Sequence, residues 1–196
     1  MSMARPHLAI LAALLCFLSC NGGAASDAVS DSCDAIRDFV DATFCASRLR
    51  SVPGAAAADR HGHLLMAADL AAASGASARD AAAAMAREAA AAAAAEGPGG
   101  SGDQAAAAAA RDTLEACGML YGSASVPALR LMRGYAAARS WGAARALLPL
   151  TGQAGIGCDA ALAGAGTEAA AGRMAGANRE FDQLSTMATA LLNKVS

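Results

Sequence analysis

The chain has 196 residues and a formal net charge of −2, about one domain of sequence without the excess of basic residues typical of nucleic-acid binding. Hydrophobic residues make up 56 % of it, but about 60 residues are alanine and only 4 % are aromatic. Alanine is the best helix former and a poor strand former. The composition therefore excludes a strand-rich sandwich, barrel or large α/β sheet, predicts an all-α protein and disfavours an enzyme built on a sheet.

Residues 1–25 have the pattern of a secretory signal peptide. Arg5 provides the positive charge, Leu8 to Leu18 form the apolar core, and small residues at 23–25 provide a cleavage site. A membrane anchor is disfavoured because this core is too short to span a bilayer. Acylation of Cys20 is a third interpretation that the residues before it fit poorly. We expect a secreted, extracellular chain with no membrane attachment after cleavage.

Four cysteines follow the leader: Cys33, Cys45, Cys117 and Cys158. An even number in a secreted chain predicts disulfides, with three connectivities open, and the absence of closely spaced pairs disfavours a zinc site. One continuous helix would separate Cys33 from Cys45 by ~18 Å, too far for a disulfide. If these two pair, the chain must reverse between them as a short helical hairpin, which leaves Cys117 with Cys158.

Helical periodicity is visible in the first half of the mature chain. A helix is predicted over 27–42, on the spacing of Val29, Cys33, Ile36 and Val40, with a change of direction around 43–45. Residues 52–54 predict a turn, and a long helix should follow over 56–96 with a bend at Gly75.

The glycine-rich segment 97–102 predicts a loop, after which Asp103 should cap a helix over 103–122. Its apolar stripe is Leu114, Cys117, Tyr121 and Ala124. Gly122 and Pro127 predict a break or kink before a helix over 129–139. Another helix should begin near Trp141 and end before the glycines of 152–157, and a weaker helical region should follow Cys158.

The last helix has the best pattern, with apolar residues in alternating steps of four and three, typical of a bundle helix. These residues are Ala177, Phe181, Leu184, Ala188, Leu191 and Val195.

Sequence motifs for catalysis are missing. His61 and His63 form a His-Gly-His pair, but no carboxylate or cysteine nearby completes a metal site. The acidic residues are scattered and adjoin arginines, as on a solvated helix face. We therefore predict no catalytic residue, no metal and no cofactor.

The order of features resembles the plant invertase and pectin methylesterase inhibitor family over nearly the whole mature chain. The matching segments are the early cysteine pair with Phe44-Cys45-Ala46-Ser47-Arg48-Leu49, the Leu-x-x-Cys-x-x-x-Tyr segment at 114–121, Gly157-Cys158-Asp159, and the final helix from Asn178. The resemblance implies a four-helix bundle over 55–196 preceded by a helical hairpin over 26–54. It also implies disulfides joining Cys33 with Cys45 and Cys117 with Cys158.

The resemblance further implies a secreted inhibitor of a cell-wall carbohydrate-active enzyme, in the apoplast or the vacuole, that blocks the active-site cleft by one-to-one docking. The wide spacing of the first two cysteines is closer to the invertase-inhibitor branch, which favours acid invertase over pectin methylesterase as target. Invertase inhibitors carry Pro-Lys-Phe before the third bundle helix. Arg139, Ser140 and Trp141 occupy the corresponding slot and are the candidate inhibitory surface.

Two other functions fit the composition. A helical carrier of a small apolar ligand or lipid predicts an apolar internal cavity, although alanine-rich helices pack closely and leave little room. A structural or storage protein without a specific partner is the third hypothesis.

Overall fold

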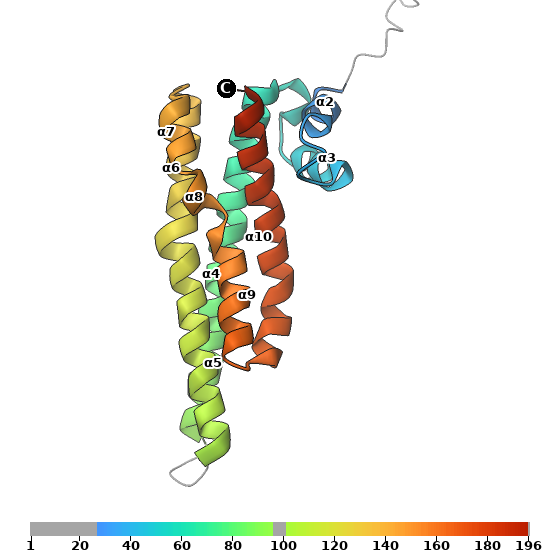
Figure 1. Ribbon diagram of the computed structural model, residues 1–196. Coiled ribbons are helices and arrows are strands. Elements are labelled where there is room, and N and C mark those ends of the chain that lie inside the picture. Colours follow the sequence, from blue (N-terminus) through green and yellow to red (C-terminus); the bar gives the residue numbers. More distant parts are fainter. Residues whose placement is uncertain (1–26, 96–100, 196) are drawn as a thin grey trace, which may run out of the picture.

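The structure is a computed structural model that describes residues 27–95 and 101–195, so the expected signal peptide lies outside the described residues. These residues form helices and turns without a strand, as the composition predicts. Four long rods run side by side: α4 (Arg60–Ala95), the continuous rod α5–η3–α6, α9 (Gln153–Gly164) and α10 (Glu168–Val195) (Figure 1). The predicted all-α, disulfide-linked bundle with an N-terminal hairpin is confirmed.

The N-terminal hairpin consists of α2 (Ala28–Asp34) and α3 (Ala42–Arg50). The prediction of one helix over 27–42 was wrong, because α2 ends at Asp34 and the chain reverses within 35–41. The Asp41 carboxylate accepts a hydrogen bond from the backbone N–H of Phe44 at 2.8 Å. This N-cap starts a new helix ahead of the expected turn at 43–45. The disulfide Cys33–Cys45, with a Cα–Cα distance of 5.7 Å, closes the hairpin.

Helix α4 follows the short 3-10 helix η1 (Ala55–Ala57) and begins later than the predicted residue 56. Asp59 caps it, accepting from the backbone N–H of Gly62 at 2.8 Å. The helix continues through Gly75 without interruption. A Cβ at Gly75 would lie 2.7 Å from Val126 and 2.8 Å from Phe181, so this glycine permits close helix packing instead of a bend.

The second rod combines α5 (Ser101–Met119), the π-helix η3 (Leu120–Ser125) and α6 (Val126–Ala137). The chain does not break at Gly122 and Pro127; instead the α-helix changes to the π-helix η3 over 120–125, and Pro127 lies in the first turn of α6. Helix α5 begins at Ser101, so Asp103 is not its N-cap. The wider π-helical turn shifts the register, and Ser125 takes the buried place expected for Ala124.

Two short helices, α7 (Trp141–Ala146) and α8 (Leu148–Thr151), lead back into the bundle. Helix α9 then runs through Gly155 and Gly157, so the expected glycine-rich interruption was wrong. The disulfide Cys117–Cys158 joins α5 to α9 at a Cα–Cα distance of 4.7 Å.

The core runs between α4, the α5–η3–α6 rod, α9 and α10, and the hairpin covers part of it. Helix α10 buries Phe181, Leu184, Ala188 and Leu191 of its predicted stripe. The Phe181 ring packs edge-on against Tyr121 of η3, with ring centroids 5.0 Å apart. This pair joins the two largest fully buried side chains of the described residues, in a core otherwise made mostly of alanine, leucine and methionine.

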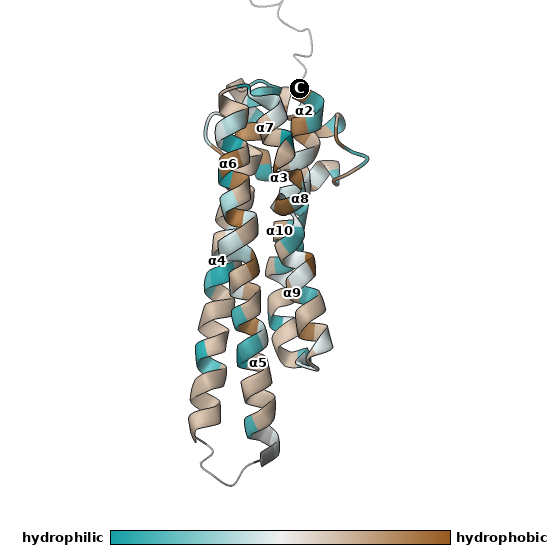
Figure 2. Ribbon diagram, turned by 60° about the vertical axis from the view of Figure 1, so that its left-hand side comes forward, coloured by the Kyte–Doolittle hydropathy of each residue, from teal (hydrophilic) through white to brown (hydrophobic). Residues whose placement is uncertain are grey.

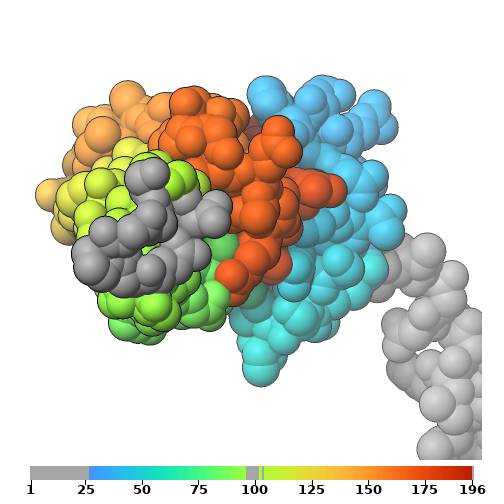
Figure 3. All heavy atoms as spheres, turned by 90° about the horizontal axis from the view of Figure 1, so that it is seen from below, coloured from blue at the N-terminus to red at the C-terminus, as the bar shows by residue number. Residues whose placement is uncertain are grey.

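The hairpin and the α5–α6 rod lie on opposite sides of the molecule, as the view from below shows (Figure 3). The lower ends of α4 and α5 reach beyond the turn between α9 and α10 (Figure 1), and most of the residues there are weakly hydrophobic, with hydrophilic residues between them (Figure 2). Within the described residues, no helix combines the length and the apolar character needed to cross a membrane.

Candidate functional site

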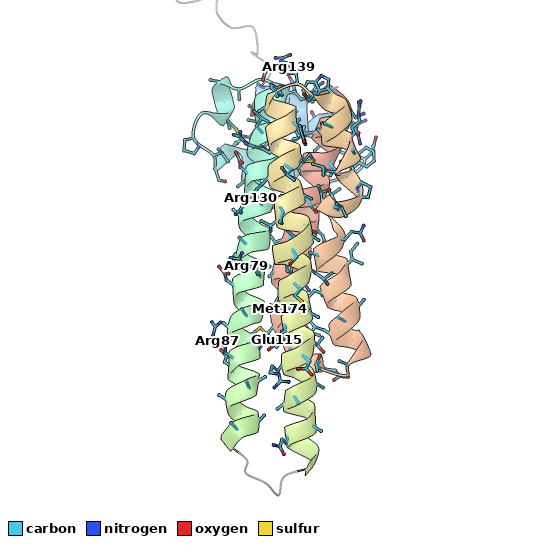
Figure 4. The ribbon with its side chains drawn as sticks, turned by 90° about the vertical axis from the view of Figure 1, so that its left-hand side faces the viewer. Arg79, Arg87, Glu115, Arg130, Arg139 and Met174 are labelled. Atoms are coloured by element: carbon cyan, nitrogen blue, oxygen red, sulfur yellow. A yellow bond between two sulfur atoms is a disulfide. The ribbon has the colours of Figure 1, made fainter. Side chains whose placement is uncertain are left out.

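The predicted surface residues lie at the upper end of the bundle, where α6 turns into α7; Figure 4 labels Arg139 at this end. The turn is a Schellman motif: the Arg139 N–H donates to the Ala136 carbonyl at 2.9 Å and the Ser140 N–H to the Tyr135 carbonyl at 2.8 Å. Arg139 occupies the position after the helix cap with φ +56°, where glycine is usual. An arginine is thus held there, exposed, in a fixed conformation.

Trp141 is half-buried beside this turn, neither wholly in the core nor wholly on the surface. Its ring meets His61 edge-on, with ring centroids 5.5 Å apart and an interplanar angle of 84°. The His61 Nε2 atom lies 2.9 Å from the Ala136 carbonyl oxygen, which can only accept, so Nε2 carries the proton. His61 therefore braces both the tryptophan and the end of α6.

At the upper end of the bundle, the carboxylate of Asp59 lies near the positive charge of Arg139. The backbone N–H of Gly62 hydrogen-bonds to Asp59 and holds the pKa of that carboxyl below its usual value; the nearby charges of His61 and Arg139 act in the same direction. Asp59 is therefore ionised at neutral pH, and the upper end presents Arg139 next to a fixed negative charge.

Two apolar side chains on α6 extend the surface, and the sequence pattern did not single them out. Leu131 is 54 % exposed and Tyr135 is 43 % exposed, one helical turn apart and one to two turns before Arg139. Large apolar residues outside the buried stripe of Leu129 and Met132 were the signal that could have found them.

The two histidines do not share a metal site. His63 is buried, with Nδ1 2.8 Å from the Ser32 hydroxyl and Nε2 2.8 Å from the Ala55 carbonyl. Both ring nitrogens of His63 are thus used to hold the hairpin and η1 against α4. The part of the chain that the structure describes contains no cluster of three metal-ligating side chains.

A polar cluster inside the bundle was also missed by the sequence pattern. The Tyr121 hydroxyl donates to Asn178 at 2.8 Å, and the Asn178 amide donates in turn to Asp159. Burial raises the pKa of Tyr121, so its hydroxyl stays protonated as a donor. These groups join η3, α9 and α10 through satisfied hydrogen bonds, which is a structural role.

Asp182 lies near this cluster. Its Oδ1 atom is buried and has no hydrogen-bond partner. Burial, followed by the charge of Asp159, raises the pKa of Asp182 to about 6.

No protein-family model matches the chain, and no curated protein or solved structure matches it. The class of protein defined by its own residues is a disulfide-linked helical bundle.

Proposed function

We propose that this protein is a secreted inhibitor of a cell-wall carbohydrate-active enzyme, with acid invertase as the favoured target and pectin methylesterase as the second. It acts in the apoplast, or in the vacuole, by docking one-to-one over the active-site cleft, and it has no catalytic activity of its own. The order of cysteines and helices quoted above supports the family, and the upper end of the bundle supports the mode of action.

The observation that carries the proposal is the braced turn at Arg139, Ser140 and Trp141. Binding energy concentrates in a few residues, with tryptophan and arginine over-represented among them. A rigid turn loses little conformational entropy on binding. The exposed guanidinium of Arg139 has the geometry to pair with a carboxylate of the enzyme, and glycosidases carry acidic catalytic pairs.

The test compares inhibition of purified acid invertase by the parent and by the double variant R139G/W141A. Glycine removes the side chain and also suits the positive φ of position 139, so loss of inhibition from this change does not reflect unfolding. We expect inhibition to weaken by at least ~2 kcal/mol, about 30-fold. The exposed Arg37 in the hairpin provides a matched control, and R37A should inhibit like the parent.

Full inhibition by the double variant would show that another surface binds the enzyme. A parent that inhibits pectin methylesterase and not invertase would move the target to the second enzyme. The parent protein can also be immobilised and incubated with a cell-wall extract. If neither invertase nor pectin methylesterase activity is retained on it, the inhibitor proposal is wrong.

A further inference from the structure

A groove with a volume of about 560 Å³ runs between α4 and α5 in the lower half of the bundle, open to solvent on one side. The apolar part of its wall consists of Ala83, Ala86, Ala90, Leu114, Gly118 and Met119, and Ser123 of η3 also lines it. The volume lies within the range of small-molecule sites. Alanine and glycine leave this space at the surface because they cover little of the valley between two closely packed helices.

Charged side chains stand along the groove, and most of them are paired within the protein. Arg79 forms an ion pair with Asp80 at 2.8 Å, and Glu115 approaches Arg111 at 3.9 Å. Arg87 is exposed and forms no hydrogen bond or ion pair with any side chain of the described residues. Arg87 is therefore the one charged lining residue without an ion pair among the described residues, whereas Glu115 shares Arg111 with Asp112.

Glu88, the neighbour of Arg87 along α4, interacts electrostatically with Arg87 but has a closer ion-pair partner. Glu88 forms an ion pair with Arg173 of α10 at 2.8 Å. Figure 4 labels Arg79 and Arg87 on α4, eight residues apart in the sequence, and Glu115 on the neighbouring α5. The methylene stems of the two arginines extend the apolar wall while their guanidinium groups stay in water.

We propose that this groove binds a free long-chain fatty acid, with the alkyl chain along the alanine, leucine and methionine wall and the carboxylate on Arg87. An apolar wall with a single unpaired guanidinium complements a ligand with one tail and one anionic head, and a planar guanidinium pairs well with a carboxylate. This inference goes beyond the proposed inhibition and does not rest on it. It gives the carrier hypothesis an open groove in place of the internal cavity expected above.

The first experiment is calorimetric titration of the full-length mature protein with dodecanoate below its micelle concentration. Decanoate tests the contribution of the tail, and affinity should fall about two- to fourfold for each methylene removed. Dodecyltrimethylammonium has the same tail with a cationic head and should bind at least about tenfold more weakly than dodecanoate.

The second experiment fills the groove. A Cβ at Gly118 meets no atom within 4 Å, so leucine at this position occupies the groove without a clash, and leucine favours a helix over glycine. G118L should remove dodecanoate binding. Gly176 of α10 has equally open space outside the groove, so G176L is the matched control and should bind like the parent. R87Q should weaken binding about two- to fivefold, as for an exposed ion pair.

Circular dichroism and thermal melting establish that the variants are folded. Failure of the parent to bind dodecanoate, equal binding of the cationic amphiphile, or unchanged binding by G118L would each overturn the proposal. Binding to vesicles that contain anionic lipid, without binding of the free acid, would identify a membrane surface as the ligand and would overturn it as well.

Discussion

Gly155 of α9 lies directly against the Asp182 side chain of α10. A Cβ at this position would lie 2.1 Å from Oδ1 of Asp182, so even alanine forces this carboxyl group out of its place between the helices. We expect G155A to lower the free energy of unfolding by about 1–3 kcal/mol in urea titrations. G176A provides the comparison, because its Cβ has open space and alanine should gain about 0.5–1 kcal/mol. Equal stability of the two variants would contradict the close packing.

Asp182 makes the folding stability of the protein depend on pH. Its pKa in the folded state is about 6, above that of an unfolded aspartate, because burial and Asp159 disfavour the charged form. The folded state therefore binds more protons between about pH 4 and pH 6. The neutral carboxyl stabilises the fold below this window, and this contribution is lost as the pH rises through 6.

The isosteric variant D182N tests the effect. We expect the free energy of unfolding of D182N to match that of the parent near pH 4.5 and to exceed it at pH 7.5 by on the order of 1 kcal/mol. The figure is small because solvent screens the partly exposed carboxyl. Urea unfolding at both pH values measures the difference. A constant difference between D182N and the parent at the two pH values would contradict the raised pKa.

At the level of elements, the stripes of three and four residues predicted which faces are buried. Leu114, Cys117 and Tyr121 are buried as expected, and so is most of the α10 stripe. Periodicity succeeds here because the apolar face of a helix can be recognised from the sequence of that helix alone. The expectation that glycine bends or ends a helix was wrong at Gly75 and Gly155, where each glycine packs against a helix remote in sequence.

The candidate site was predicted only in part, for a similar reason. The exposed turn at Arg139 and the adjoining Trp141 follow from local sequence. The contact between Trp141 and His61, however, joins residues 80 positions apart and depends on how α4 meets α6. The fatty-acid groove likewise needs the register of α5 against α4, which near-uniform alanine does not specify.

The two disulfides restrain loops of different length, with sequence separations of 12 and 41. Loop-entropy arithmetic gives about 3 kcal/mol for Cys33–Cys45 and about 4 kcal/mol for Cys117–Cys158. We expect paired alanine replacements of each bridge to lower the free energy of unfolding by these amounts in urea. A melting temperature that does not change on reduction would show that packing alone holds the bundle.

The hairpin has further attachments besides its own bridge. The His63 ring holds Ser32 and Ala55, and ion pairs join Arg50 with Asp27 and Arg48 with Glu180. The variant that lacks Cys33–Cys45 should therefore keep the hairpin docked on the bundle. The Cys117–Cys158 bridge, by contrast, directly joins the two long rods α5 and α9.

Across the whole molecule, the proposed docking end and the fatty-acid groove are well separated, since Arg139 lies at the top of Figure 4 and Arg87 in the lower half. The two proposed activities should therefore be separable. We expect G118L to inhibit the target enzyme like the parent, and R139G to bind dodecanoate like the parent. Inhibition assays and calorimetry on the same two preparations check this, and loss of both activities in either variant would contradict independent sites.

The π-helix η3 sets the rotation of α6 about the helix axis relative to α5. An α-helix turns by about 100° per residue, so deleting one residue within 120–125 would rotate α6 by that angle about its own axis. Arg130 and Arg133 would then arrive at the positions of Leu129 and Met132 and carry their charges into the core. The extra residue of the π-helix therefore sets the rotation of α6 about its axis, and with it the side of the bundle on which the Arg139 turn is exposed.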